Sequence, residues 1–240
     1  MRQQLTLQDR YRGALVGLAV GDALGAAVEF KTPGSFIPLT DMVPSPVHQI
    51  PAGYWTDDGT MALCLAESLI KCNGLNANDN LNRYSRWRRH GYYSSNDTCF
   101  DIGNQTHQAL RYYEQYGQPL PPHLYAENAG NGSLMRLAPV PMAYFSHPEL
   151  LVKMCAASSR TTYTSPLCTD ACRFFGLVLG GAFSGFEKED LLRPDFWARH
   201  TGKEMILHSK IEHVALGSYK SKDTYIRGTG YVVDSLEAAL

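Results

Sequence analysis

Two adjacent carboxylates at the expected start of a helix are the residues of this sequence best suited to bind a metal ion. Thr56, Asp57 and Asp58, followed by Thr60, place hydroxyl and carboxylate oxygens within one turn. Oxygen ligands of this kind are those that Mg²⁺, Mn²⁺ and Ca²⁺ prefer. Acidic residues at a helix N-terminus also interact favourably with the helix dipole, so the spacing alone leaves both a metal site and an ordinary helix start open.

A second acidic pair lies earlier in the chain, on a helical face lined with glycine. Glu29 follows Asp22 at a spacing of seven residues, which places both on roughly the same side of a helix. Four glycines share that face at intervals of four residues: Gly13, Gly17, Gly21 and Gly25. This pattern predicts that another backbone or a ligand comes very close to the face. The alternative is the solvated end of a helix.

Two further segments place polar groups next to expected helix starts. Asp101, in the sequence Asp-Ile-Gly, is either a site carboxylate or the N-cap of a turn. Asn131 and Gly132 precede another expected helix, where backbone N–H groups are able to hold a phosphate or a sugar. Asn-Gly is also a common turn, so this segment alone is a weak signal.

Several other patterns have a simpler interpretation. His208, Glu212 and His213 approach a zinc motif, but their spacing matches no zinc-protease signature, which favours a surface helix. The basic and aromatic residues 83–89 indicate a solvated helix face, with docking to an acidic or nucleic-acid partner as the alternative. The segment Gly228-Thr229-Gly230 lacks the third glycine of a dinucleotide-binding loop.

The elements that must position these residues are all predicted to be helices. Thr6 and Asp9 have capping-box spacing, which predicts a helix from about residue 7 to residue 30. Residues 31–55 hold five prolines and predict a long ordered loop. No segment alternates as a strand does, so the sequence predicts an all-α, compact multi-helix fold in one domain over residues 1–240. The other helices are expected at about 57–72, 78–90, 104–116, 132–145, 148–159, 166–183, 188–200 and 203–217, with a short last helix capped by Asp234.

Composition narrows the possible functions and compartments. Among 240 residues, 44% are hydrophobic and 19% charged, and the formal net charge is −1. A polycationic nucleic-acid binder is therefore excluded. The six cysteines form no C-x-x-C pair, which favours reduced thiols in a cytoplasmic protein. The apolar run 13–21 is too short to span a membrane, and the acidic residues at its two ends argue against a signal peptide. We expect a monomer that binds neither membranes nor nucleic acid.

Taken together, the four chemical segments resemble one family, the ADP-ribosylglycohydrolases. The resemblance rests on residues 11–30, on Trp-Thr-Asp-Asp-Gly-Thr-Met-Ala-Leu at 55–63, on Asp-Ile-Gly at 101–103, and on Gly-Asn-Gly-Ser-Leu-Met-Arg-Leu-Ala-Pro-Val at 130–140. Their order and spacing match over the whole chain. The Asp-Ile-Gly element is most similar to the branch that includes the dinitrogenase reductase-activating glycohydrolase and the arginine-specific enzymes.

The resemblance implies a hydrolase that removes ADP-ribose from modified protein side chains by cleaving the bond at the ribose anomeric carbon, with arginine as the expected side chain. It implies an all-α fold and two Mg²⁺ or Mn²⁺ ions in a cleft. Thr56, Asp57 and Asp58 match the first set of metal ligands. Glu29 matches an acidic residue of the cleft, and Asp101 matches one near the leaving group.

The resemblance also assigns residues to ADP-ribose and shows two departures. The positions that match the substrate site are Gly103, Asn131, Gly132, Ser133 and Tyr163, and Tyr163 stands where the family often has histidine. The family has a second acidic metal motif, Gly-Asp-Thr-Asp-Thr, near its C-terminus. The chain ends before that motif, so we expect it to be C-terminally incomplete. An alternative follows from this expectation: a catalytically silent module that binds ADP-ribose or blocks a modified partner.

Overall fold

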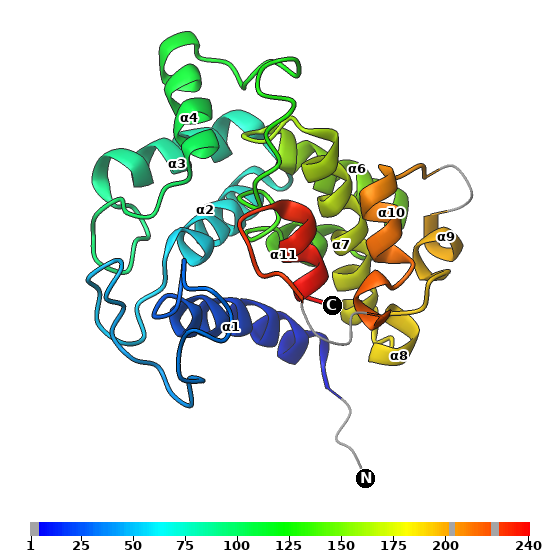
Figure 1. The fold of residues 1–240 in the computed structure, drawn as a ribbon. Helices are drawn as coiled ribbons and strands as arrows, with labels where there is room; N and C mark the ends of the chain where they lie inside the picture. The colour runs from blue at the N-terminus through cyan, green and yellow to red at the C-terminus, as the bar shows by residue number, and fades with distance from the viewer. Residues whose placement is uncertain (1–4, 202–204, 222–225) are drawn as a thin grey trace.

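Every regular element in the described part of the chain is a helix. The computed structural model describes residues 5–201, 205–221 and 226–240. Within these ranges, strand pairing is limited to two isolated antiparallel bridges, which join Ser45 to Ile50 and Gly130 to Tyr231. The prediction of an all-α fold is confirmed. The helices (Figure 1) are α1 (Leu7–Gly25), α2 (Asp57–Cys72), α3 (Ala77–His90), α4 (Asn104–Tyr116), α5 (Pro139–Tyr144), α6 (Pro148–Arg160), α7 (Pro166–Ser184), α8 (Lys188–Leu191), α9 (Phe196–Thr201), α10 (Ser209–Ala215), the 3-10 helix η1 (Ser218–Ser221) and α11 (Val232–Ala238).

Helix α1 begins where its capping box predicts and ends earlier than expected. Thr6 Oγ1 accepts a hydrogen bond from Asp9 N at 3.2 Å, and Asp9 Oδ2 accepts one from Thr6 N at 3.0 Å. The helix ends at Gly25, and residues 26–30 form turns in place of the predicted continuation to Phe30. Phe30 has φ 59°, a left-handed conformation that an α-helix excludes. The turns redirect the chain at Glu29.

The glycine face of α1 has no close protein neighbour. A Cβ placed at Gly13, Gly17, Gly21 or Gly25 would meet no other atom of the described residues within 4 Å. The expected close approach of another backbone is therefore wrong, because α1 packs against α2 and α7 through its other side. Gly21 and Gly25 instead line an open cavity, which agrees with the other alternative, the approach of a ligand.

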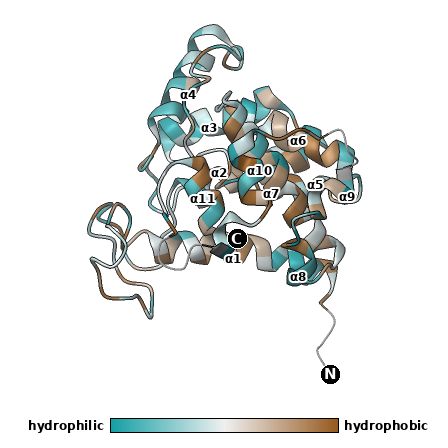
Figure 2. Cartoon of the chain, turned by 45° about the vertical axis from the view of Figure 1, so that its right-hand side comes forward, coloured by the Kyte–Doolittle hydropathy of each residue, from teal (hydrophilic) through white to brown (hydrophobic). Residues whose placement is uncertain are grey.

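Glycine does permit a close helix contact, but it does so in α7. A Cβ at Gly176 would lie 2.4 Å from the Sγ of Cys155 on α6, so only glycine allows these two helices to come this close. The main hydrophobic core surrounds α7 and is completed by α2, α5, α6, α10 and α11. Figure 2 shows the contrast between the hydrophobic α7 and the hydrophilic α8.

Helix α7 is also long and apolar enough to cross a membrane, by length and composition alone. Within that apolar window, 61% of the residues are buried inside the protein. A helix that is apolar on all sides is expected at the centre of a core as well as in a membrane. The central position of α7 therefore accounts for its composition.

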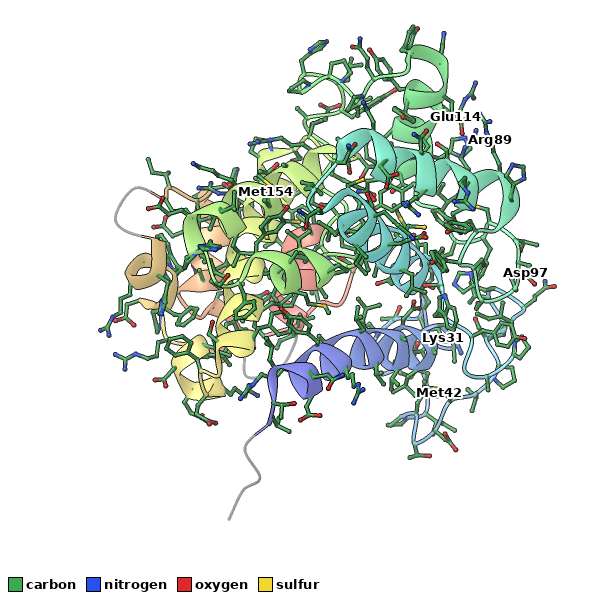
Figure 3. The ribbon with its side chains drawn as sticks, turned by 180° about the vertical axis from the view of Figure 1, so that it is seen from behind. Lys31, Met42, Arg89, Asp97, Glu114 and Met154 are labelled. Atoms are coloured by element: carbon green, nitrogen blue, oxygen red, sulfur yellow. The ribbon has the colours of Figure 1, made fainter. Side chains whose placement is uncertain are left out.

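A smaller core lies between α2, α3 and α4 and explains the basic helix. Tyr84 and Trp87 of α3 are fully buried, so the aromatic residues of this segment serve packing. Arg86 and Arg89 are exposed, Arg83 and Arg88 are only partly exposed, and Arg88 and Arg89 both pair with Glu114 of α4. Arg89 and Glu114 lie side by side in Figure 3. This pairing favours the simple interpretation, in which a charged surface is balanced by its own carboxylates.

The later helices differ from the sequence prediction at their boundaries. The helix expected at 188–200 is divided into α8 and α9, with Pro194 between them, where proline cannot continue a helix. The expected helix 132–145 is reduced to α5, and the one expected at 203–217 to α10, part of its predicted start lying outside the described residues. Helix α11 starts at Val232 with Tyr231 as its N-cap, so the prediction that Asp234 caps it was wrong. Asp234 instead accepts a hydrogen bond from Thr229 Oγ1 at 2.8 Å.

Candidate active site

A large cavity of about 1170 Å³ lies where the four chemical segments of the sequence meet. The segments come from the end of α1, the start of α2, the loop before α4 and the loop before α5, and a segment before α11 adds a further wall. Its polar lining residues include Asp22, Glu29, Thr56, Asp57, Asp58, Asp101, Gln105, Asn128, Asn131, Tyr163, Arg227 and Thr229.

Five carboxylates converge on this cavity from four separate parts of the chain. Asp22 belongs to α1, Glu29 to the turn after it, Asp57 and Asp58 to the first turn of α2, and Asp101 to the loop before α4. The two neighbouring aspartates therefore share one hollow with the early glutamate. Such a concentration of negative charge is costly unless protons or cations balance it.

The start of α2 is held by a carboxylate from α1. Asp22 accepts hydrogen bonds from Thr56 N at 2.9 Å, from Thr56 Oγ1 at 2.7 Å and from Gly59 N at 2.8 Å. Thr56 is the N-cap residue, as predicted, but its side chain makes no capping hydrogen bond to the helix. Asp22 thus satisfies backbone donors that a capping side chain would otherwise take, and it fixes Asp57 and Asp58 against the cavity.

Burial and mutual repulsion make these carboxyl groups hard to ionise. Burial, with added repulsion from Asp22, Glu29 and Asp101, raises the pKa of Asp58 to about 7. The same causes, with Asp58 as the strongest charged neighbour, raise the pKa of Asp57 well above its usual value. Burial and the charge of Glu29 raise the pKa of Asp101 to about 6. A bound cation would relieve this repulsion.

The first three predicted ligands have the donor chemistry that a hard divalent cation needs. Asp57 and Asp58 offer carboxylate oxygens to the cavity. The hydroxyl of Thr56 gives its proton to Asp22, so its oxygen lone pairs stay available to a cation. Oxygen donors in an acidic setting fit Mg²⁺ or Mn²⁺.

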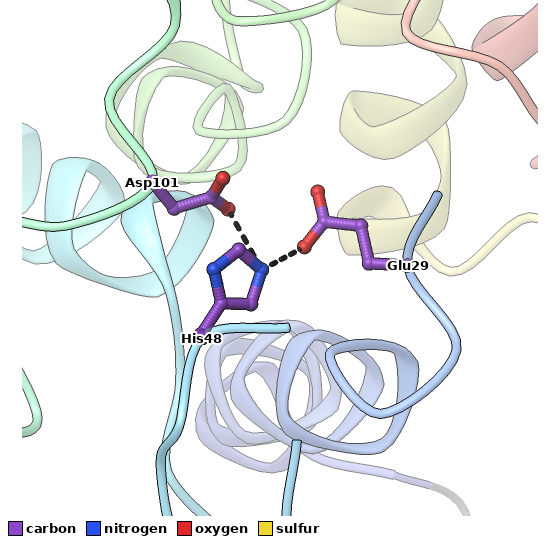
Figure 4. Close-up of side chains that lie close together, drawn as sticks. All are labelled: Glu29, His48 and Asp101. Atoms are coloured by element: carbon purple, nitrogen blue, oxygen red, sulfur yellow. Dashed lines mark hydrogen bonds and ion pairs between the residues drawn. The ribbon is translucent and has the colours of Figure 1, made fainter. Parts of the chain in front are cut away.

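Glu29 and Asp101 meet at a histidine that the sequence patterns did not single out (Figure 4). His48 Nε2 lies 2.5 Å from Glu29 Oε2 and 3.7 Å from Asp101 Oδ2. The three side chains offer atoms within 4.8 Å of one another, a spacing that a metal ion is also able to bridge. His48 lies in the proline-rich loop 31–55, and no local motif marks it, which is why sequence reasoning missed it.

Four of the five residues predicted to bind ADP-ribose line the cavity, and one does not. Gly103, Asn131, Gly132 and Tyr163 line it. A Cβ at Gly132 would lie 2.5 Å from the Tyr163 hydroxyl, so glycine is required where the ring packs against this turn. Ser133 is not among the described lining residues, so its place at the substrate stays a prediction.

The side chain of Ser133 faces the interior because it bonds to two buried neighbours. Its Oγ accepts hydrogen bonds from Ser159 Oγ at 2.9 Å and from Cys172 Sγ at 3.5 Å. The residue is 1% exposed. It therefore stabilises the base of the turn behind the cavity wall.

Some residues that line the cavity were not predicted as site residues, because the sequence marks them only weakly. Gln105 donates to the carbonyl of Thr162 at 3.0 Å and accepts from Asn128 Nδ2 at 2.8 Å, which ties three segments together. The segment 227–230, set aside because it lacks a third glycine, also lines the cavity. It reaches the wall by backbone pairing, since Asn131 N donates to Gly230 O at 2.9 Å. Only this long-range pairing reveals its position.

An all-helical body with a cavity walled by carboxylates and a glycine-rich turn defines a helical protein with a site for cations and a polar ligand. Comparison with known proteins makes this more specific. The family model for ADP-ribosylglycohydrolase matches residues 3–240. The chain belongs to the ADP-ribosylglycohydrolase family.

Individual relatives agree with this assignment and with the arginine-type branch. The chain is 36% identical over 233 residues to the ADP-ribosylarginine hydrolase Tri1 of Serratia proteamaculans, covering 97% of this chain and 61% of that protein. It is 33% identical over 185 residues to the ADP-ribosyl-dinitrogen reductase glycohydrolase of Rhodospirillum rubrum, covering 75% of this chain and 60% of that protein. A solved structure described as an ADP-ribosylglycohydrolase-related protein complex matches with a TM-score of 0.81 and 37% identity, covering 98% of this chain and 75% of the other. The chain thus spans about three fifths of the length of these two curated relatives.

Proposed function

We propose that this chain hydrolyses the bond between ADP-ribose and a modified arginine side chain of a protein, with Mg²⁺ or Mn²⁺ held by Thr56, Asp57 and Asp58. Membership of the family and the names of its relatives support removal of ADP-ribose from proteins. The arginine acceptor and the metal are our extension.

One observation carries the proposal: five carboxylates from separate segments face one cavity. Cleavage at the anomeric carbon builds positive charge on the ribose, and fixed carboxylates beside it stabilise that charge. A structural role alone would not gather acidic groups at such a cost, because burying carboxylates together opposes folding.

The remaining residues supply binding and proton transfer. A bound divalent metal would orient the ribose diol and lower the pKa of a water molecule. Asp101, whose pKa is raised to about 6, is able to hold a proton near neutral pH and give it to the departing guanidine. Glu29 faces the same cavity and is placed to accept a proton from the attacking water. Asn131, Gly132 and Tyr163 form the wall that we assign to ADP-ribose.

The direct test is release of ADP-ribose from an arginine-ADP-ribosylated protein, measured with Mg²⁺ or Mn²⁺ and with a chelator. Release that needs the metal supports the proposal. Calorimetry with ADP-ribose distinguishes the alternative: binding with no release and no metal dependence indicates a silent binding module. If the chain neither binds ADP-ribose nor releases it from the modified protein, both functions are rejected for this chain.

A further inference from the structure

We propose that His48 is a positioning residue that holds Glu29 and Asp101 at a fixed separation from behind the cavity wall, an inference that rests on the proposed function. Among the described hydrogen bonds, the only side-chain partner of Glu29 is His48 Nε2, at 2.5 Å. The same nitrogen lies 3.7 Å from Asp101 Oδ2. A neutral imidazole with its proton on Nε2 is sufficient for the hydrogen bond to Glu29, while Asp101 Oδ2 lies next to the same nitrogen, beyond hydrogen-bond distance.

The direction from which His48 approaches the two carboxylates distinguishes a positioning role from a direct catalytic role. Glu29 and Asp101 line the cavity, whereas His48 is not among its described lining residues. The histidine side chain is 8% exposed. His48 therefore contacts the two carboxylates without reaching the space that a substrate would occupy, and Figure 4 shows it lying between them.

His48 is itself held in place by the loop and by aromatic rings. Its backbone N donates to Ser45 Oγ at 3.3 Å, and that hydroxyl donates to the carbonyl of Ala26 at 2.6 Å, just past the end of α1. The imidazole lies beside the rings of Phe30 and Phe100, with centroids 6.2 and 5.8 Å away. The turn around His48 is thus tied to the segment that carries Glu29.

The backbone supports the same interpretation. Phe30, which follows Glu29, has φ 59°, Gln49, which follows His48, has φ 55°, and Asp101 itself has φ 57°. Non-glycine residues adopt this left-handed conformation at a cost and keep it only where the surroundings enforce it. Each of these three residues belongs to the Glu29–His48–Asp101 cluster or directly follows one of its members. The contact of His48 with both carboxylates is the interaction that links them.

Steady-state kinetics of His48→Ala and His48→Gln test the proposal, with Val47→Ala as the matched control. Val47 is the preceding residue of the same loop and is 43% exposed. We expect His48→Ala to lower kcat by about tenfold to a hundredfold, because misplacing catalytic groups by about 1 Å costs this much, with KM changed less than about threefold. Glutamine offers an N–H donor near the position of Nε2, so His48→Gln should recover most of the loss. An unchanged kcat in His48→Ala, or a loss that glutamine does not restore, would overturn the proposal.

Hydrogen–deuterium exchange in the presence of a chelator gives a second readout that does not depend on activity. We expect faster exchange at residues 26–30 and 100–103 in His48→Ala, and exchange like that of the unmodified chain in His48→Gln and Val47→Ala. If the unmodified chain proves inactive, the proposed function fails while this measurement still decides the role of His48. Equal exchange in all four proteins would refute the positioning role.

Discussion

Replacing Asp58 with asparagine should stabilise the metal-free protein at alkaline pH. The side chain keeps its shape and loses its charge. Burial and the neighbouring carboxylates raise the pKa of Asp58 from 3.8 to about 7. Because the folded-state pKa is raised, the stability that this group contributes is present below about pH 4 and is lost as the pH rises through 7.

The size of the effect follows from that shift. A change of about three pKa units corresponds to about 4 kcal/mol, which is the cost of ionising Asp58 in the folded protein at pH 8. By the same linkage the cost is only about 2 kcal/mol at pH 5, where the folded carboxyl is mostly protonated. Relief of the repulsion on Asp57 acts in the same direction. Asp58→Asn should therefore exceed the unmodified chain in stability, and the difference should grow from pH 5 to pH 8.

Urea unfolding in the presence of a chelator, between pH 5 and 8.5, measures this difference directly. Asp41→Asn is the matched control, since Asp41 is an exposed loop residue and does not line the cavity. Saturating Mn²⁺ should reverse the order, because binding to the folded state stabilises only a protein that keeps the ligand. A gain that does not vary with pH, or no gain at pH 8, would refute the electrostatic argument.

Three further predictions test other parts of the site. Asp57→Ala should abolish the rise in melting temperature on adding Mn²⁺, and a shift equal to that of the unmodified chain would contradict the metal site. At pH 5, where Asp58 is mostly protonated and little repulsion is relieved, Asp22→Ala should lower the free energy of unfolding by about 1–3 kcal/mol, because buried donors at the start of α2 lose their acceptor; an unchanged urea midpoint would show that this cap is unimportant. Gly132→Ala should destabilise the protein by about 1–3 kcal/mol, since its Cβ would lie 2.5 Å from the Tyr163 hydroxyl, whereas Gly13→Ala, with no neighbour within 4 Å, should stabilise it by about 0.5–1 kcal/mol. Equal urea midpoints for these two variants would contradict the packing argument.

Local sequence rules predicted most of the helices well. The capping box at Thr6, the first-turn prolines at 148 and 166 and the glycines at 91 and 117 all mark helix ends that the structure confirms. These features act within a few residues, so a short window of sequence contains the whole interaction. Some predictions failed where distant contacts decide, as at the end of α1 and the start of α11, whereas the division between α8 and α9 follows from the local effect of Pro194.

The tight-packing role of glycine shows the same limit. The regular spacing in α1 predicted the close approach of a backbone or a ligand, yet glycine permits a close helix contact between α7 and α6, at Gly176 and Cys155. Periodicity reveals which residues share a face. It does not reveal which other helix that face meets, because the meeting depends on the whole arrangement of the core.

The residue types and their order were enough to indicate the family and to name the carboxylates of the cavity wall, since acidic residues next to helix ends are a local pattern. Only the tertiary structure brought Asp22 to the start of α2, turned Ser133 into the interior, and placed His48 between Glu29 and Asp101. These three outcomes depend on contacts between residues 19 to 53 positions apart along the chain, where no local spacing fixes distance or direction.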